Sequence, residues 1–214
     1  MQTDCMKRWA RQFGLGGALL AAAGCPPEVP DGGDASEVIS RVTLSFSPTA
    51  GGEARVFAFT DPDGDGGMSG MAETITLAAG VEYTLTIGLE NSLSDPPVDI
   101  GAEVGAEAEE HMIFVVGDVA GPASLAASAL VSHAYADRES DYGANEVGDD
   151  LPLGLENTIT ATTAGEGTFR VILRHLPPVN GAPQKSADLP MDLAEGRELP
   201  GSVDVDVSFA LTVE

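Results

Sequence analysis

Cysteine is nearly absent from this sequence of 214 residues, which contains only Cys5 and Cys25. Cys5 lies in a segment that we expect to be removed on export, so no second thiol would remain to pair with Cys25. We therefore expect no disulfide bond within the mature chain, even in an oxidising compartment. The shortage also excludes an internal cysteine nucleophile. Packing, together with any bound metal ion, must hold the fold.

Basic residues are scarce as well. Ten Lys and Arg stand against 34 Asp and Glu, which gives a formal net charge of −24 at pH 7. Such a charge repels phosphate backbones and anionic lipid head groups, and it excludes nucleic acid as a partner. An acidic, glycine-rich surface is also typical of a plain solvated shell, so acidity alone indicates no ligand.

Aromatic residues make up 5% of the chain, and the single tryptophan, Trp9, lies near the N-terminus. This composition predicts a core of Val, Leu and Ala with many turns. No apolar run is long enough to cross a bilayer as a helix. The sequence also lacks the G-x-S-x-G, H-E-x-x-H, phosphate-loop and dinucleotide motifs. We therefore predict a protein that is not an enzyme.

The N-terminus has the pattern of an exported protein. Three basic residues precede the short apolar run 13–23, which ends in small residues before Cys25. A basic head, a short apolar middle and a small-residue end predict a signal peptide over residues 1–24. The end resembles the lipobox of bacterial lipoproteins, with Ala22 where leucine is usual. We predict that Cys25 is lipidated; an ordinary cleaved signal that leaves a free cysteine is the alternative.

The predicted lipidation of Cys25 indicates where in the cell the protein is located. Acyl chains on Cys25 would anchor the protein to a membrane by burying methylene groups. The polar Pro/Gly sequence PPEVPDGGDAS follows, and it predicts a flexible tether over residues 25–37. We expect the protein in the cell envelope, at the outer membrane or on the periplasmic side, with the cell surface as a further option.

Residues 38–214 are predicted to form a single β-sandwich domain. Apolar and polar residues alternate in short segments such as 38–47 and 203–213, and residues 73–89 are predicted to form a hairpin. About nine such segments predict an all-β fold, an antiparallel sandwich of the Ig-like or jelly-roll type. Two long loops, 136–154 and 177–201, are typical of functional or mobile segments.

One stretch, residues 98–116, changes to helical spacing before it returns to an apolar strand. With Asp95 as the cap and proline in the first turn, we predict one short acidic helix here. At 100° per residue, Glu107 and His111 fall on one side of that helix, and Glu110 flanks them. Side chains four residues apart can hold one divalent cation. The alternative is a helix with solvated acids and a hydrogen-bonded histidine.

A second histidine, His175, ends the strand-like segment TFRVILRH on its apolar side. If this segment lies antiparallel to one that begins at His111, both imidazoles lie at the same end of the sheet. We predict a zinc- or copper-class site formed by His111, His175 and either Glu107 or Glu110. The third histidine, His133, is interpreted as a structural or surface residue.

A possible calcium turn is formed by Asp61, Asp63 and Asp65, which alternate with other residues and precede glycine. This spacing is the opening of an EF-hand loop. The twelfth position is Ala72 instead of a bidentate acid, however, and the flanking segments are strand-like. We predict weak calcium binding at most; a tight acidic turn without an ion is the alternative.

Four short motifs stand out in the chain: Asp63-Gly64, Glu109-Glu110-His111, Pro152-Leu153-Gly154-Leu155 and Leu173-Arg174-His175-Leu176-Pro177. They resemble those of a group of uncharacterised bacterial lipoproteins that carry the automatic name "type 1 periplasmic binding fold superfamily protein". The resemblance implies an exported lipoprotein and assigns no reaction. The group's name implies an α/β fold, whereas βαβ alternation is absent from this sequence, so we expect strands. The long acidic loop 137–150 departs from the group.

These patterns together predict an exported, lipid-anchored envelope protein that binds a divalent metal ion or a small ligand without catalysis. It would reach the membrane through its N-terminal lipid and would pass its ligand to an outer-membrane transporter. The alternative is a structural or interaction module that docks another envelope protein and binds no metal. The two hypotheses differ in whether His111 and His175 meet in space.

Overall fold

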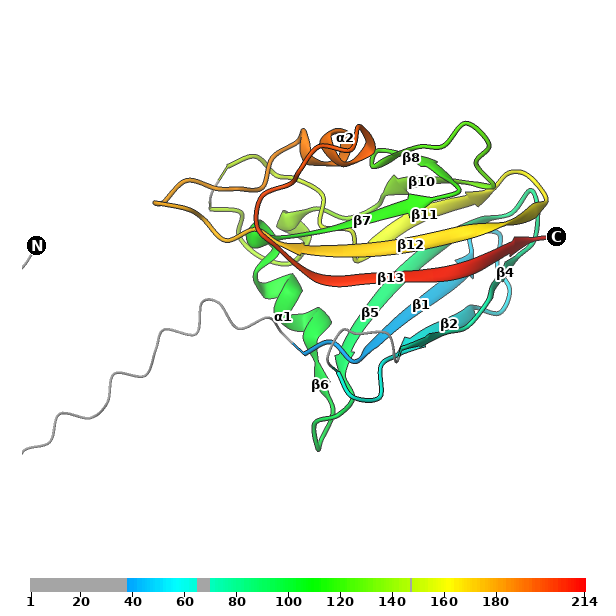
Figure 1. Cartoon of the computed structure of the whole chain (residues 1–214), viewed down its shortest axis with the longest axis horizontal. Helices are drawn as coiled ribbons and strands as arrows, with labels where there is room; N and C mark the ends of the chain where they lie inside the picture. Colours follow the sequence, from blue (N-terminus) through cyan, green and yellow to red (C-terminus); the bar gives the residue numbers. More distant parts are fainter. Residues whose placement is uncertain (1–37, 65–69, 147) are drawn as a thin grey trace, which may run out of the picture. The chain divides into compact units, whose positions relative to one another are not determined.

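Two β-sheets pack face to face in the computed structural model, which describes residues 38–64, 70–146 and 148–214 (Figure 1). The larger sheet has the strand order β3-β2-β1-β5-β11-β10-β8-β9, and β6 pairs with β5 beside this path. The smaller sheet has the order β4-β13-β12-β7. The strands of the larger sheet are β1 (Arg41–Pro48), β2 (Arg55–Thr60), β3 (Met71–Ala72), β5 (Glu82–Asn91), β6 (Val98–Asp99), β8 (Val119–Gly121), β9 (Ser124–Leu125), β10 (Val131–Tyr135) and β11 (Glu156–Ala161). Those of the smaller sheet are β4 (Ile75–Leu77), β7 (His111–Gly117), β12 (Gly165–His175) and β13 (Ser202–Val213).

The core between the sheets follows from side-chain alternation. Successive side chains of a strand point to opposite faces, so alternate residues of β1, β5, β12 and β13, such as Leu44, Leu85, Val171 and Phe209, are buried in one shared core. Phe46 of β1 meets Phe169 of β12 with ring centroids 5.9 Å apart in an edge-to-face arrangement, a favourable geometry for two rings. The predicted all-β class is confirmed.

The sheets are mixed, which corrects the prediction of purely antiparallel pairing. The pairs β8–β10 and β4–β13 are parallel, and all other pairs of named strands are antiparallel. The described residues form thirteen strands where about nine were predicted. The additional strands include two-residue segments such as β3, β6 and β9, which are too short to carry a recognisable alternation.

The hairpin predicted over residues 73–89 is wrong. Its first half forms β4, which pairs with β13 of the smaller sheet, and its second half forms β5, which pairs with β1 and β11 of the larger sheet. Gly80 adopts a positive φ of 78° at the turn between them, a conformation that suits glycine. The turn was therefore recognised, but each strand finds its partner far away in the sequence.

Two α-helices are present in the described residues where one was predicted. The acidic helix α1 (Ile100–Ala106) continues into the 3-10 helix η1 (Ala108–Glu110), while α2 (Leu189–Ala194) lies in the second long loop. A further 3-10 helix, η2 (Glu139–Asp141), lies in the first long loop. Leu189 of α2 packs with Met112, Phe114 and Ile172 on the outer face of the smaller sheet. Six residues give too little helical period for α2 to be found from sequence.

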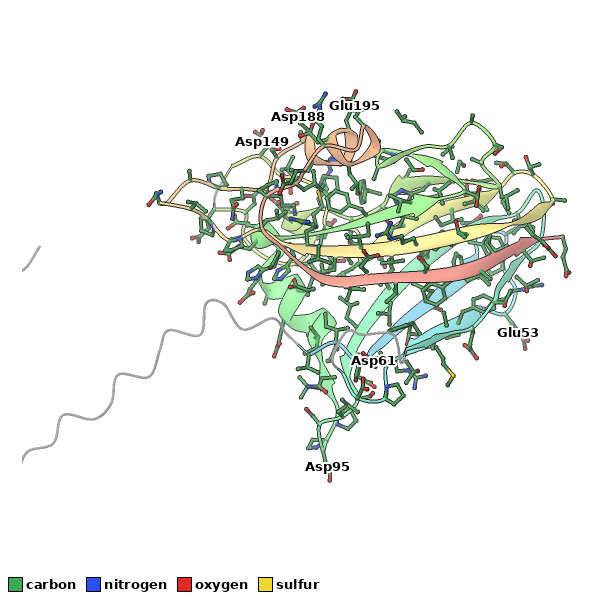
Figure 2. All side chains as sticks on the ribbon, in the orientation of Figure 1. Glu53, Asp61, Asp95, Asp149, Asp188 and Glu195 are labelled. Atoms are coloured by element: carbon green, nitrogen blue, oxygen red, sulfur yellow. The ribbon has the colours of Figure 1, made fainter. Side chains whose placement is uncertain are left out.

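The predicted start of the acidic helix is also wrong. Asp99 is the N-cap, and its carboxylate accepts a hydrogen bond of 3.2 Å from the backbone N–H of Ala102. Asp95 lies at the tip of the loop that precedes β6 (Figure 2). The chain first pairs β6 with β5 and only then begins the helix. Tertiary pairing thus moved the cap by four residues.

Candidate metal centre

His111 and His175 lie side by side on neighbouring strands. His111 is the first residue of β7 and His175 the last residue of β12, and the antiparallel register places them directly opposite each other. Their ring centroids are 4.7 Å apart and their planes differ by only 8°. Figure 1 shows this end of the two strands on the same side as α1. The two imidazoles therefore meet, as the antiparallel pairing of the two segments required.

Both histidines belong to the core face of the smaller sheet. By alternation His111 shares its side with Ile113, and His175 shares its side with Leu173, which are both part of the core between the sheets. The side chain of His111 is only 2% exposed and that of His175 is 22% exposed. The pair thus sits at the rim of the core, with one buried ring and one partly accessible ring.

Carboxylates lie beside both rings. Glu107, His111 and His175 each offer one ligand atom, and these atoms all lie within 4.8 Å of one another. Oε2 of Glu110 lies 3.7 Å from Nε2 of His175. Glu107, Glu110 and Glu139 also line a small pocket. Every residue that the sequence assigned to the transition-metal site is therefore in one place.

The helical argument for Glu107 and His111 is nevertheless wrong. The α-helix ends at Ala106, Glu107 is its C-cap, and η1 separates Glu107 from His111. The apolar run that begins at His111 pairs with β12 along its whole length, and this pairing ends the helix. The two side chains approach because a single 3-10 turn folds the chain back, and not because they share a helix face.

A hydrogen bond fixes the proton on His111. Its Nδ1 lies 3.1 Å from the backbone carbonyl oxygen of Glu107, so Nδ1–H donates and Nε2 keeps its lone pair. Burial lowers the pKa of His111 to about 4; the carbonyl of Glu107 opposes this shift, while the charges of His175 and Lys185 add to it. His111 is therefore neutral at pH 7, which is the form that binds a metal ion.

The stacked rings must change orientation to share one ion. The lone pair of an imidazole nitrogen lies in the ring plane, so two nearly parallel rings direct their lone pairs side by side rather than to a common point. Rotation of one ring about its χ2 torsion, which is a broad and soft coordinate, brings both to one ion. His175 is the more exposed ring and has the freedom to turn.

Sequence reasoning missed the buried ion pair that holds this segment. Nζ of Lys185 lies 2.7 Å from Oε1 of Glu139 and donates a 2.7 Å hydrogen bond to the carbonyl of Ala108 in η1. Both charged side chains are almost fully buried, and burial lowers the pKa of Lys185 while Glu139 opposes that shift. The available signal was the isolation of Lys185, which is the only lysine after Lys7.

Asp204 is a second residue that the sequence did not assign. Its side chain is 3% exposed, and Oδ2 lies 4.0 Å from Nε2 of His111. Burial raises the pKa of Asp204, against the lowering effect of His175 and Arg174. The repeating pattern VDVDV places aspartates on the face opposite the valines, and it therefore gave no reason to connect Asp204 with a core-facing histidine.

His133 has a structural role, in line with its interpretation. It is buried, and its Nε2 donates a 2.8 Å hydrogen bond to Oδ1 of Asn157 on the neighbouring strand β11. Its ring also contacts Tyr135 edge-on, with centroids 4.9 Å apart. Burial lowers the pKa of His133, so the residue serves the packing of β10 on β11 in its neutral form.

The candidate calcium turn follows β2. Asp61, which is labelled in Figure 2, is buried. Its backbone N–H donates a 2.7 Å hydrogen bond to the carbonyl of Ser40. Strands flank this turn, as the sequence predicted, with β3 on its far side. Asp65 lies outside the described residues, and calcium binding by Asp61, Asp63 and Asp65 stays a prediction.

We expect millimolar calcium to raise the melting temperature of the protein by only a few degrees, because the turn lacks the bidentate twelfth ligand of a tight site. Asp63→Ala should abolish this rise, since it removes a central carboxylate. Differential scanning fluorimetry with calcium, magnesium or chelator measures it. The Asp149→Ala variant in the acidic loop is the control, and an equal rise in both variants would indicate non-specific screening.

The predicted signal peptide, residues 1–24, and the predicted tether, residues 25–37 with Cys25, lie outside the described residues. Within the described residues, no helix is long and apolar enough to cross a membrane. No family model, curated protein or solved structure matches the chain. The resemblance to the lipoprotein group therefore stays a prediction.

Proposed function

We propose that this protein binds one divalent transition-metal ion, of the zinc or copper class, through Glu107, His111 and His175, without catalysing a reaction. The observation that supports it is the approach of ligand atoms from these three side chains to within 4.8 Å of one another. Imidazole nitrogen and carboxylate oxygen are preferred ligands of zinc, and imidazole also suits copper. Glu110 is a second carboxylate within reach of His175.

The proposal also includes a cellular location. The pattern of residues 1–24 and the lipobox-like end at Cys25 support export and lipid anchoring in the cell envelope. A metal-binding lipoprotein there would hold its ion close to the membrane and could deliver it to an outer-membrane transporter. The contact between His111 and His175 supports this reading over an interaction module that merely docks an envelope protein.

Zinc titration of the purified protein tests the proposal. After treatment with chelator, and with any affinity tag free of histidine, we expect one Zn²⁺ per chain by isothermal titration calorimetry. His175→Ala should bind at least about 100-fold more weakly, because loss of an outer partner of a ligand alone already costs about 10–100-fold. Wild-type protein that binds no zinc or copper, or binds them as His175→Ala does, would refute the proposal.

Two glutamate variants distinguish coordination of the ion by Glu107 from attraction of the ion by the overall negative charge. Glu107→Gln removes the carboxylate beside His111 and should weaken zinc binding by about 10-fold or more. Glu103→Gln removes the same charge from an exposed position one turn earlier in α1 and should leave the affinity unchanged. Equal losses in both variants would mean that the acidic field, and not coordination by Glu107, attracts the ion.

A further inference from the structure

Asp204 carries a buried carboxylate without a hydrogen-bond partner for one of its oxygens. Oδ1 is fully enclosed and accepts no hydrogen bond from any described residue. Oδ2 lies 4.0 Å from Nε2 of His111, which is too long for a hydrogen bond. Buried polar atoms are nearly always paired, so an unpaired carboxylate oxygen in the interior needs a reason. An ion bound in the functional state is such a reason, because the carboxylate could hold it through both oxygens or turn Oδ1 toward it about its broad χ2 torsion.

A β-bulge delivers this side chain to the histidines. Along β12 and β13, Leu173 pairs with Val205, but the next residue, Arg174, pairs with Val203, so Asp204 is the extra residue. A bulge interrupts alternation and re-aims a side chain. Asp206, two residues further along β13, keeps the regular pattern and pairs with Arg170 on the outer face. Asp204 therefore points toward the histidines, whereas Asp206 of the same strand points to the outer face of the sheet.

His111 presents its free nitrogen to Asp204. Nδ1 of His111 donates to the carbonyl of Glu107, so Nε2 holds a lone pair and faces Oδ2 of Asp204. No hydrogen bond joins the two atoms, and a cation between them would be bound by both. Ligand atoms of a tetrahedral zinc ion lie about 3.4 Å apart, given bonds of about 2.0–2.2 Å. A shift of about 0.6 Å would thus bring both atoms onto one ion.

Resting on the proposed metal site, we infer that Asp204 is a further ligand of the ion, bound on the Nε2 side of His111. The site then consists of two imidazoles, Asp204 from the interior and Glu107 from the solvent side. Oε2 of Glu107 lies 4.0 Å from Nδ1 of His111, the protonated nitrogen, and this side chain, which is 55% exposed, would swing to the Nε2 side to reach the ion. This set contains nitrogen and oxygen ligands only. It suits Zn²⁺ and disfavours Cu⁺, which prefers thiolate and thioether sulfur.

Replacement of Asp204 by asparagine, with Asp206→Asn as the control, tests the inference. Asp206→Asn removes the same charge from the same strand at an exposed position. We expect Asp204→Asn to weaken Zn²⁺ binding by about 10-fold or more and to change the visible absorption of the Co²⁺-substituted protein. Asp206→Asn should change neither. The apo protein should not lose melting temperature with Asp204→Asn, because Oδ1 of this buried side chain has no hydrogen bond to lose.

The outcomes separate this inference from the proposed function. If wild-type protein binds Zn²⁺ and Asp204→Asn binds it with the same affinity and the same Co²⁺ spectrum, Asp204 is not a ligand, while the site of Glu107, His111 and His175 stands. If wild-type protein binds no zinc, both fail. A second variant, Asp204→Glu, keeps the charge; it should bind Zn²⁺ more tightly than Asp204→Asn, and failure to do so would count against coordination.

Discussion

Lys185→Met is expected to lower the free energy of unfolding by about 3–5 kcal/mol, the typical loss when one partner of a buried ion pair is removed. The substitution keeps the apolar stem but leaves the carboxylate of Glu139 buried without its counter-charge. It also removes the donor to the carbonyl of Ala108. Since Ala108 lies in η1 between Glu107 and His111, the variant should weaken zinc binding as well.

Urea denaturation monitored by circular dichroism measures this effect, with chelator present so that no metal contributes. Arg197→Met is the matched control, because Arg197 forms ion pairs with Asp192 and Glu195 while its own side chain is 61% exposed. Exposed pairs contribute about 0–1 kcal/mol. The double variant Lys185→Met/Glu139→Gln should recover much of the loss. A change below about 1 kcal/mol in Lys185→Met would show that the pair does not stabilise the fold.

Acid is expected to destabilise the metal-free protein by about 3 kcal/mol through His111 alone. The pKa of this residue falls from 6.5 in the unfolded chain to about 4 in the fold, and each pKa unit corresponds to about 1.4 kcal/mol. Between these two values the unfolded state binds a proton that the folded state does not. Stability from this group is therefore complete above pH 6.5 and is lost as the pH falls toward 4.

His111→Gln isolates this contribution because glutamine does not titrate. The difference in unfolding free energy between pH 7 and pH 4 should be about 3 kcal/mol smaller in the variant than in wild-type protein. Asp204 acts in the opposite direction, since burial raises its pKa and its contribution is lost as the pH rises. Because Asp204 is present in both wild-type protein and His111→Gln, its contribution cancels to first order when the two are compared. Parallel pH profiles would contradict a buried neutral His111.

Local alternation was sufficient to predict the face of the sheet on which His175 lies. In TFRVILRH the apolar positions Phe169, Val171 and Leu173 all lie in the core between the sheets, and His175 follows on the same side. From the sequence, the antiparallel pairing that places His111 opposite His175 was an assumption and not a prediction. Alternation specifies which face a side chain takes, but it does not specify which strand lies next to it.

The elements that sequence reasoning missed depend on distant partners. Lys185 and Glu139 come from two separate loops and meet only at η1. Asp204 reaches His111 only because β13 carries one more residue than β12 at the bulge. The hairpin predicted over residues 73–89 failed for the same reason, since β4 and β5 join different sheets. None of these pairings leaves a periodic signal in the local sequence.

The sequence by itself determined the all-β class, the acidic surface and the chemistry of the residues Glu107, Glu110, His111 and His175. These properties follow from composition and from alternation between neighbours along the chain. Only the tertiary structure decided that the two imidazoles stack on adjacent strands, that a 3-10 turn and not a helix brings Glu107 to them, and that Asp204 faces them from within. Register, bulges and charge burial arise from contacts between residues far apart in the chain.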